Sequence, residues 1–471
     1  MSQYEFKTHP KYDEMKGVWK TCRDAACGQR AIHKGGELYL SKLNGQDDKE
    51  YKAYLMRSVF FGATGRTVEG MSGLVFRKAM SVEVPDAVTG WGDNITATGK
   101  SLKGFSKQAV NEVITVGRAG ILVDFPSVSE GAKPKTKMQS DKMGLRPYLS
   151  LYQAEDIIYW ETATLNNLKK LFLVDLTEKY YEGGEEKLQV RRLTLEGGHY
   201  VQCIYRKVGE KGTWEKHEEF TPQVSGKNMY EIPFYFLAAN EPDTEIQDPV
   251  IEELAYVNIS HYRNSADLEN GAHISGLPTP YITGITSSGD EEEDEFYVGS
   301  NAAWVISDSD AKVGYLQVGA EGFAALEKLM DRKEGQMAAL GARLLAPEKK
   351  AAEAAETAQI KKGAETSVLA TLVGSVGDQI QKAIKFAVMW AGYDVTDVRF
   401  ELSKDFMSYP MTPQMLKEWL AAWQSGGVSD LTFYEGLQTG ELVAETLGFE
   451  EEQQRKEDSV PAIGGDDEDR E

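Results

Sequence analysis

The chain has 471 residues, of which 41% are hydrophobic and 27% are charged, so it can bury a sizeable core without disulfide staples. Its 52 basic and 74 acidic residues give a net charge of −22, which argues against a monomer that coats nucleic acid through a broad basic surface. The cysteines Cys22, Cys27 and Cys203 are odd in number, which argues against a disulfide framework and fits a reducing compartment. No apolar run reaches the ~18 residues that span a bilayer.

The first part of the chain, up to about Val84, is predicted to be helical. Apolar side chains recur at helical spacing over Asp48–Phe61. A second amphipathic helix is predicted over Ser106–Val116, and the glycine-containing run that starts at Gly117 should end it. The apolar run Ile121–Pro126 then predicts a buried strand that proline terminates.

Short strands are predicted from Pro147 to Leu237, because aromatic and β-branched residues are frequent there. Paired glycines at 183–184 and 197–198 indicate turns between some of them. Val201, Cys203 and Tyr205 alternate with Gln202 and Arg206, which predicts a strand that is buried on one face only. We expect an α+β region with an antiparallel sheet. The predicted strands are Tyr148–Trp160, Leu168–Leu176, Leu188–Leu195, Tyr200–Arg206 and Ile232–Leu237.

Two helices that flank a small insert are predicted next. The first should start at Asp248, as N-cap, with Pro249 in the favoured first position, and run to about Ile274. The second should begin at Glu321 and be interrupted at Pro347. Two such helices form an antiparallel hairpin, which would be stabilised if identical hairpins packed side by side in a closed ring. The alternative is an ordinary helical hairpin packed on its own domain.

The insert between these helices is predicted to contain strands at Thr279–Ile285 and Ala303–Ile306. An acidic loop lies between the two strands. It could be a solvated loop, a surface that docks a partner, or a divalent-cation site, although six consecutive carboxylates lack the spacing of a calcium loop. The loop consists of Asp290, Glu291, Glu292, Glu293, Asp294 and Glu295.

The longest helix-prone stretch runs from Glu348 to Trp390. A strand is predicted at Arg399–Leu402, and Pro413 should open a further helix. Ser429 is expected to cap a last short helix. From Glu450 onward the chain is acidic and is expected to be disordered.

Catalytic motifs are nearly absent from the sequence. There is no Gly-x-x-x-x-Gly-Lys-[Ser/Thr] loop, which excludes a P-loop ATPase, and no His-Glu-x-x-His helix. The 6 histidines are scattered singly and are expected to be packing or solvated residues rather than ligands. We therefore predict no enzymatic activity, no metal site and no cofactor.

Six segments, taken in chain order, carry more information than any single motif. They are Tyr54–Phe60, Gly73–Lys78, Gly117–Pro126, Pro147–Trp160, Glu253–Asp267 and Gly341–Leu345. With these segments the chain resembles the portal proteins of tailed bacteriophages, which are head-to-tail connectors. The resemblance covers nearly the whole chain except the acidic C-terminal stretch.

The resemblance implies an α+β, portal-like fold with an α/β wing, a helical-hairpin stem, a small β-containing clip and a long helix beside a channel. The implied parts are the N-terminal wing (1–247), first stem helix (248–276), clip (277–318), second stem helix (319–345), tunnel loop (346–357), long wing helix (358–392), C-terminal wing with a small crown (393–449) and acidic tail (450–471).

The resemblance also implies a function. Portal proteins form dodecameric rings at a capsid vertex and act as passive channels through which double-stranded DNA is packaged and ejected. The implied partners are further copies of the chain, the DNA, the terminase large subunit, the major capsid and scaffold proteins, and the head–tail adaptor, with no membrane. The implied location is the virion portal vertex, after assembly in the host cytoplasm.

An acidic ring would repel the duplex and keep it central, and a few cations near the channel would steady it. The predicted channel residues are Arg343, Lys349 and Lys350 with the small Ala351 and Ala352 in the tunnel loop, and Lys328, Arg332 and Lys333 on the second stem helix. Each of these cations could instead be a solvated helix charge. In the clip, the loop Asp290–Glu295 is predicted to dock the terminase or an adaptor.

Two other classes remain open from the sequence. One is another virion structural or adaptor protein. The other is a soluble acidic hydrolase, which would need a pocket with convergent polar groups that the sequence does not reveal.

Overall fold

The structure, a computed structural model, describes most of the chain. The described residues are 4–126, 139, 143–165, 167–209, 212–240, 244–276, 279–284, 310–316, 321–341, 355–404, 406, 411, 413–440, 442–444 and 447–459. They belong to two compact units, residues 1–404 and 405–471, each of which is described by itself. A strand at Arg399–Glu401 pairs with Ser81–Glu83 and so belongs to the first unit.

The N-terminal part is helical, as predicted. Its helices are α1 (Pro10–Cys27), α2 (Gln29–Gly35), α3 (Asp48–Arg57) and α4 (Ala63–Val75), joined in part by the short 3-10 helix η1 (Gly36–Leu38). Helix α3 begins with a capping box. The Asp47 side chain accepts a hydrogen bond from the backbone nitrogen of Glu50, and the Glu50 side chain accepts one from the backbone nitrogen of Asp47. Helix α3 ends at Arg57, earlier than the predicted Phe61, because the backbone of Ser58 is extended.

Helix α5 (Leu102–Val116) leads into β2 (Arg118–Asp124) through Gly117. Gly117 has φ +75°, and a Cβ atom there would lie 2.9 Å from the carbonyl oxygen of Gln247. Only glycine combines this left-handed backbone with so close an approach. Every residue of β2 is buried, as the apolar run predicted. The segment before α5 contains β1 (Ser81–Glu83) and η2 (Asp86–Asp93).

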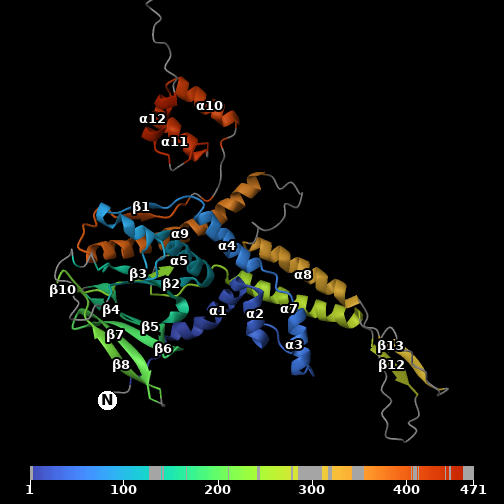
Figure 1. Ribbon diagram of the computed structural model, residues 1–471. Helices are drawn as coiled ribbons and strands as arrows, with labels where there is room; N and C mark the ends of the chain where they lie inside the picture. Colours follow the sequence, from blue (N-terminus) through green and yellow to red (C-terminus); the bar gives the residue numbers. More distant parts are fainter. Residues whose placement is uncertain are drawn as a thin grey trace, which may run out of the picture. The chain divides into compact units, whose positions relative to one another are not determined.

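Two antiparallel sheets follow, which confirms the predicted mixed class (Figure 1). The first has the order β11-β2-β3, with β3 (Tyr148–Gln153) and β11 (Phe234–Ala238). The second has the order β4-β5-β6-β7-β8, and its strand β8 was not predicted. The single predicted strand Tyr148–Trp160 is interrupted by the 3-10 turn η4 (Ala154–Asp156), which passes the chain from one sheet to the other. The strands are β4 (Ile157–Leu165), β5 (Leu168–Glu182), β6 (Glu185–Glu196), β7 (His199–Val208) and β8 (Thr213–Phe220).

The prediction that β7 is buried on one face only is wrong. All residues from Tyr200 to Tyr205 are buried. The N-terminal residues Tyr4 and Phe6 cover one face, where Cys203 and Tyr205 lie. The opposite face of the strand meets the three-stranded sheet, so that even Gln202 is 2% exposed.

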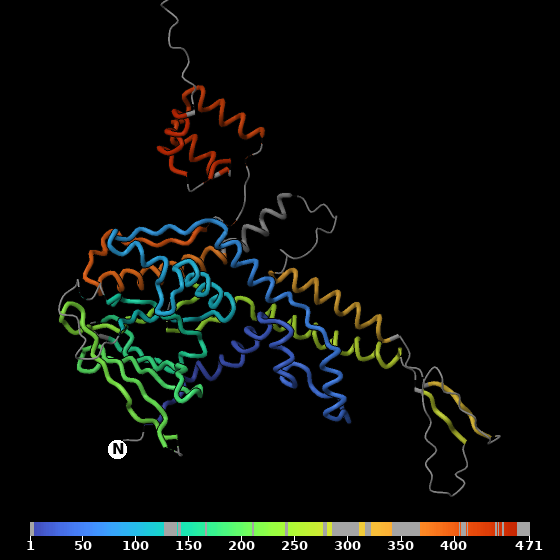
Figure 2. Tube along the Cα trace, in the orientation of Figure 1, coloured from blue at the N-terminus to red at the C-terminus, as the bar shows by residue number. Residues whose placement is uncertain are grey.

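The second half of the first unit is built on three helices: α7 (Glu252–Gly276), α8 (Glu321–Ala339) and α9 (Ala355–Trp390). Helix α7 begins at Glu252 rather than at Asp248, because a turn in which Glu252 N donates to Pro249 O (3.0 Å) precedes it. Helix α9 packs on β2 and β11 and, with α5, covers one side of the three-stranded sheet (Figures 1 and 2). Strand β14 (Arg399–Glu401) pairs with β1 beside α9.

The insert between α7 and α8 contains a two-stranded hairpin of β12 (Thr279–Thr283) and β13 (Lys312–Leu316). Strand β12 matches the first predicted strand. Its partner was not predicted, and the predicted strand Ala303–Ile306 and the acidic loop Asp290–Glu295 lie outside the described residues. A further short pair, β9 (Gln223–Val224) with β10 (Lys227–Asn228), closes a turn before β11.

The second unit contains α10 (Pro413–Gln424), α11 (Asp430–Thr439) and α12 (Phe449–Ser459). Ser429 caps α11 by accepting from Thr432 N, as predicted. Disorder was predicted from Glu450 onward, and this is wrong for residues up to Ser459, because Phe449 anchors α12 through an edge-to-face contact with Tyr434. In the described part of the chain, no helix is long and apolar enough to cross a membrane.

Candidate functional site

Helix α7 is fixed to the N-terminal helices by a fully buried asparagine. Asn258 is 0% exposed, and its Nδ2 donates to the carbonyl oxygen of Phe61 (2.7 Å). Its Oδ1 accepts from Oγ1 and from the backbone nitrogen of Thr64, at 2.8 and 3.2 Å. The side-chain amide therefore uses donor and acceptor to join α7 to the start of α4, which satisfies an otherwise costly buried polar group.

Further polar contacts continue this attachment along α7. The hydroxyls of Ser58 and Tyr262 lie 2.8 Å apart. The Tyr54 hydroxyl donates to Oδ1 of Asp267 (2.5 Å), and burial, together with that carboxylate, raises the pKa of Tyr54. Tyr54 therefore remains a protonated donor at neutral pH. These contacts hold the first part of α7 rigidly against α3 (Figure 2).

Helix α8 runs antiparallel along α7, as the hairpin prediction requires. Lys333 Nζ donates to the carbonyl oxygen of Ser260 (2.9 Å), and near the other end of the pair Gly271 faces Phe323. A Cβ atom on Gly271 would lie 2.5 Å from the Phe323 ring, so glycine permits the close approach of the two helices. Met337 is buried against Leu254, near the start of α7.

A buried histidine lies at the α7–α8 contact. His261 is 3% exposed, its Nε2 lies 3.3 Å from Oε1 of Glu334, and its ring is 5.7 Å from that of Phe61, centroid to centroid. Burial lowers the pKa of His261 and outweighs the opposing effect of Glu334, while Lys333 lowers it further. The imidazole is therefore neutral at neutral pH, and its contact with Glu334 is a hydrogen bond rather than an ion pair.

The outer half of the hairpin has little core of its own. No residue of α7 from Asp267 to Gly276 is buried, and among the described side chains of α8 only Met337 is. Ile274 and Leu329 are each 46% exposed. Because two helices alone cannot bury the apolar faces of both, this surface is suited to contact with another polypeptide.

The β12–β13 hairpin shows the same property. The cross-strand pairs Pro280–Tyr315 and Ile282–Val313 place four apolar side chains on one face. Tyr315 is 64% and Val313 54% exposed. A two-stranded hairpin is marginally stable by itself in water, so its free edges and apolar face are expected to be completed by another strand or surface.

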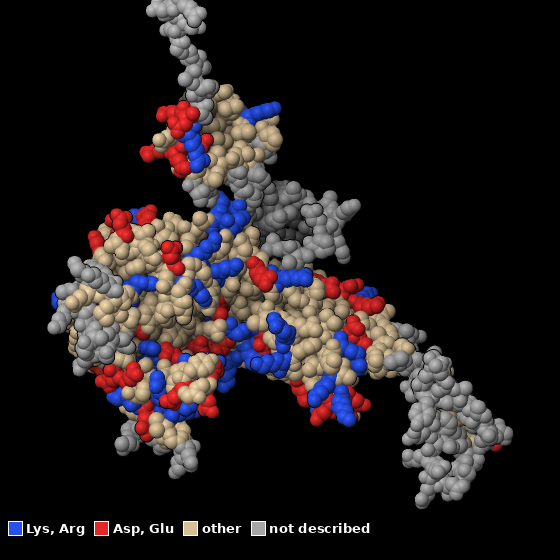
Figure 3. Space-filling model, viewed as in Figure 1, with Lys and Arg blue, Asp and Glu red and all other residues tan. Residues whose placement is uncertain are grey.

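The predicted channel cations on α8 separate into two kinds. Lys328 and Arg332 are exposed. Lys333, the third cation predicted to face a channel, donates from Nζ to the backbone of α7, and burial and then Arg263 lower its pKa. On the face in Figure 3, acidic and basic side chains are interspersed over the α7–α8 region rather than sorted by sign.

The remaining predicted site residues lie outside the described part of the chain. They are Arg343, Lys349, Lys350, Ala351 and Ala352 of the predicted tunnel loop, and Asp290, Glu291, Glu292, Glu293, Asp294 and Glu295 of the predicted clip.

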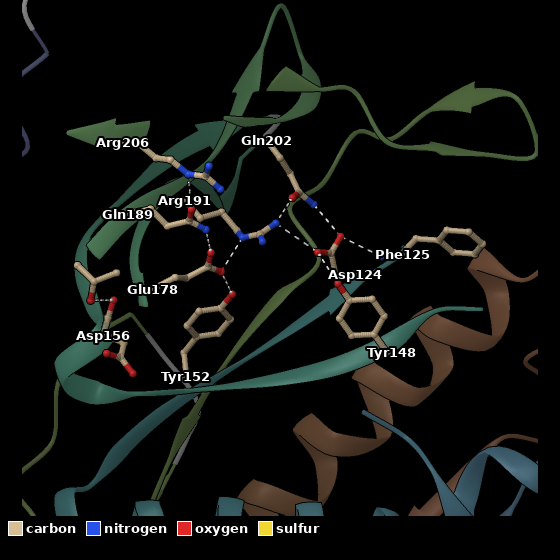
Figure 4. Close-up of polar contacts among 11 residues, drawn as sticks. Asp124, Phe125, Tyr148, Tyr152, Asp156, Glu178, Gln189, Arg191, Gln202 and Arg206 are labelled. Carbon is tan, nitrogen blue, oxygen red and sulfur yellow. Dashed lines mark hydrogen bonds and ion pairs between the residues drawn. The ribbon is translucent and has the colours of Figure 1, made fainter. Parts of the chain in front are cut away.

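A polar cluster between the two sheets was missed by the sequence analysis (Figure 4). Arg191 on β6 donates through Nε to Glu178 (2.7 Å) and through Nη1 to Asp124 (3.3 Å) and Gln202 (2.7 Å). Burial alone would raise the pKa of Glu178, but Arg191, Tyr152 and Gln189 hold it below its usual value. The sequence contains no clear signal for it, because Arg191 stands in a strand that contains several other charged residues.

This cluster borders a cavity of about 690 Å³. The hydrolase alternative required a pocket with convergent polar groups, and the structure contains one. The described lining has no serine, cysteine or histidine, and the Asp124 carboxylate in it accepts four hydrogen bonds. Among the described residues, no group of three His, Cys, Asp or Glu side chains could hold a metal ion.

Comparison with known proteins gives a partial family match and distant structural neighbours. A family model described as a domain of unknown function (DUF4055) matches residues 250–391, which include α7, α8 and α9. No curated protein matches the sequence.

The structural neighbours are chains from particle necks and a virion. "Neck of empty GTA particle computed with C6 symmetry" has 11% identity and a TM-score of 0.38, and the match covers 82% of this chain and 91% of that one. "Neck of native GTA particle computed with C12 symmetry" has 11% identity, a TM-score of 0.34 and coverages of 80% and 89%. "Virion of native gene transfer agent (GTA) particle" has 10% identity, a TM-score of 0.36 and coverages of 85% and 95%. At these identities and TM-scores the likeness supports no functional conclusion.

Proposed function

We propose that this chain is the portal protein of a tailed bacteriophage: a ring-forming, non-enzymatic conduit for double-stranded DNA at a capsid vertex. In this proposal residues 248–276 and 319–345 form the stem, 277–318 the clip and 358–392 the long wing helix. The ring is dodecameric, and it docks the terminase large subunit during packaging and a head–tail adaptor afterwards. Capsid and scaffold proteins surround it.

The observation that carries the proposal is the α7–α8 hairpin. It is anchored firmly at one end through Asn258 and Tyr262, yet its other half, Asp267–Gly276, contains no buried residue. Such a hairpin is stabilised when neighbouring copies cover its faces, and cyclic symmetry supplies those neighbours without leaving an exposed end. In the same ring, a neighbouring copy also covers the apolar face of the β12–β13 hairpin.

Two further features support a DNA conduit. The net charge of −22 on each chain would make a ring strongly acidic, which keeps a duplex from adhering to the wall while it moves. Lys328 and Arg332 are exposed and lie four positions apart on α8, so they form one short basic strip. In the ring this strip faces the channel and contacts DNA phosphates transiently.

The proposal is tested by imaging purified full-length protein in negative stain. Top views should show closed rings with an open axial hole that is wide enough for duplex DNA, roughly 20 Å or more. Compact single particles, or rings that are plugged along the axis in every class, would contradict it. Rings that do not accept DNA would instead favour another virion structural or adaptor protein.

A further inference from the structure

The cavity beside Arg191 lies apart from the surfaces proposed for assembly and DNA. It is bounded by β7 and β8 of the five-stranded sheet, by the end of β2 and by the last residue of α9, Trp390. Its volume of about 690 Å³ lies within the range of small-molecule sites in proteins. The residues of its walls determine which class of ligand it can bind.

A buried carboxylate anchors the inner wall. Asp124 is 7% exposed, and its oxygens accept hydrogen bonds from Phe125 N (2.9 Å), Gln202 Nε2 (3.1 Å), the Tyr148 hydroxyl (3.1 Å) and Arg191 Nη1 (3.3 Å). Figure 4 shows Arg191 reaching between Glu178 and Asp124. The Arg191 guanidinium is thus shared between two carboxylates, and its contact with Glu178 (2.7 Å) is shorter than its contact with Asp124 (3.3 Å).

A second carboxylate faces the same space from β8. Glu218 lies opposite Ile204 of β7 and so shares its face of the sheet, whereas Glu219 lies opposite Cys203. The Glu219 carboxylate accordingly lies on the far face, with Oε2 3.9 Å from Cys203 Sγ. Among the charged residues that line the cavity, the carboxylates of Asp124 and Glu218 face the single cation Arg191, whereas Glu219 borders the cavity but has its carboxylate on the far face.

Aromatic rings form the rest of the wall. Phe125 and Trp390 lie 5.8 Å apart, centroid to centroid, and Trp390 is held in place by donating from Nε1 to Gln223 O (3.0 Å). Tyr148 and Phe220 complete this side of the cavity. Aromatic faces next to carboxylates attract organic cations, through the ring quadrupole and through charge.

We propose that this cavity binds a small organic cation that carries an ammonium or guanidinium group. The charged group lies between Asp124 and Glu218, and its hydrocarbon body packs on Phe125 and Trp390. An anion is disfavoured by the acidic excess. A bare metal ion is disfavoured because the described residues here offer no group of three His, Cys, Asp or Glu ligands. This site goes beyond the proposed role as a conduit.

The test is isothermal titration calorimetry of the full-length protein with spermidine and with arginine amide, each up to millimolar concentration. We expect saturable binding of at least one probe. Glu218→Gln should weaken that binding about fivefold, since it removes a partly exposed charge. Glu219→Gln is the matched control: the residue borders the cavity, but its carboxylate points to Cys203 on the opposite face, so the affinity should change little.

Three results would overturn the inference. The first is the absence of saturable binding for both probes. The second is an equal loss of affinity in the Glu218→Gln and Glu219→Gln variants, which would indicate general attraction to an acidic surface. The third is much tighter binding of an arginine-containing peptide than of either probe, because the site would then be a protein-docking site. The Glu218 variant keeps the buried network intact, so misfolding does not obscure the result.

Discussion

The hydroxyl of Tyr54 on α3 donates a 2.5 Å hydrogen bond to the Asp267 carboxylate on α7, joining residues 213 positions apart in the chain. This contact lies where the buried half of α7 gives way to the exposed half. It therefore determines how firmly the base of the α7–α8 hairpin is held.

Tyr54→Phe should lower the free energy of unfolding by about 1 kcal/mol, because it removes one hydrogen bond to a charged group while keeping the buried ring. Urea unfolding measures the change. Tyr181→Phe is the control, since Tyr181 makes a similar bond to Glu186 (3.1 Å) but is 73% exposed. Equal effects in both variants would show that the Tyr54 contact is no more than a surface bond.

The α7–α8 contact should weaken in acid. Burial holds the pKa of His261 below its usual value of 6.5, so the unfolded chain takes up this proton more readily than the folded one. The stabilisation is fully present above pH 6.5 and is lost as the pH falls below it. Wild-type protein should thus lose more thermal stability than His261→Gln between about pH 7.5 and about pH 5.5.

The facing charged groups, Glu334 and Lys333, are unchanged in that variant, so the difference isolates the imidazole. His217→Gln is the control for the loss of an imidazole, because His217 lies exposed on β8, away from the α7–α8 contact. A His261→Gln variant with the same pH dependence as wild type would contradict the assignment.

Two glycine-to-alanine substitutions should change the free energy of unfolding in opposite directions. Gly117→Ala should destabilise the chain by at least about 1 kcal/mol, because φ is +75° and the new Cβ would meet the Gln247 carbonyl oxygen at 2.9 Å. Gly73→Ala should stabilise it by about 0.5–1 kcal/mol, because Gly73 lies within α4 and no atom lies within 4 Å of the new Cβ. The denaturant midpoints of the two variants, each compared with the wild type, measure these changes. A change of the same sign in both variants would contradict the roles assigned to the two glycines.

If Lys328 and Arg332 face the channel, changing both to Glu should impair DNA packaging while rings still form. The reason is that acidic side chains would repel the passing phosphates. Nuclease-protected DNA in assembled heads provides the measurement. The Lys103→Glu and Lys107→Glu pair on α5 is the matched control, since it has the same spacing, exposure and charge change. Unimpaired packaging in the α8 variant would remove this strip from the mechanism.

Much of the secondary structure could be predicted because it depends on local signals. The glycine that ends α5, the buried run of β2 and the Ser429 cap of α11 each act within a few residues. The faces of β7 could not be predicted, because residues near Tyr4, far away in sequence, cover one of them.

The candidate sites were less predictable for the same reason. In the sequence, Lys333 looks like any solvated lysine on a helix. Only the register between α7 and α8 brings its Nζ to the carbonyl oxygen of Ser260. The cluster of Asp124, Glu178 and Arg191 gathers side chains from three strands of two sheets, and no spacing in the sequence indicates that.

The mass of the purified assembly, measured by native mass spectrometry, tests the central claim most directly. Closure of identical hairpins into a dodecamer predicts a species of about 628 kDa, twelve times the chain mass of 52.3 kDa. A neighbouring ring number would correct the stoichiometry and keep the ring. A stable species at the mass of a single chain, at concentrations where particles assemble, would contradict the account.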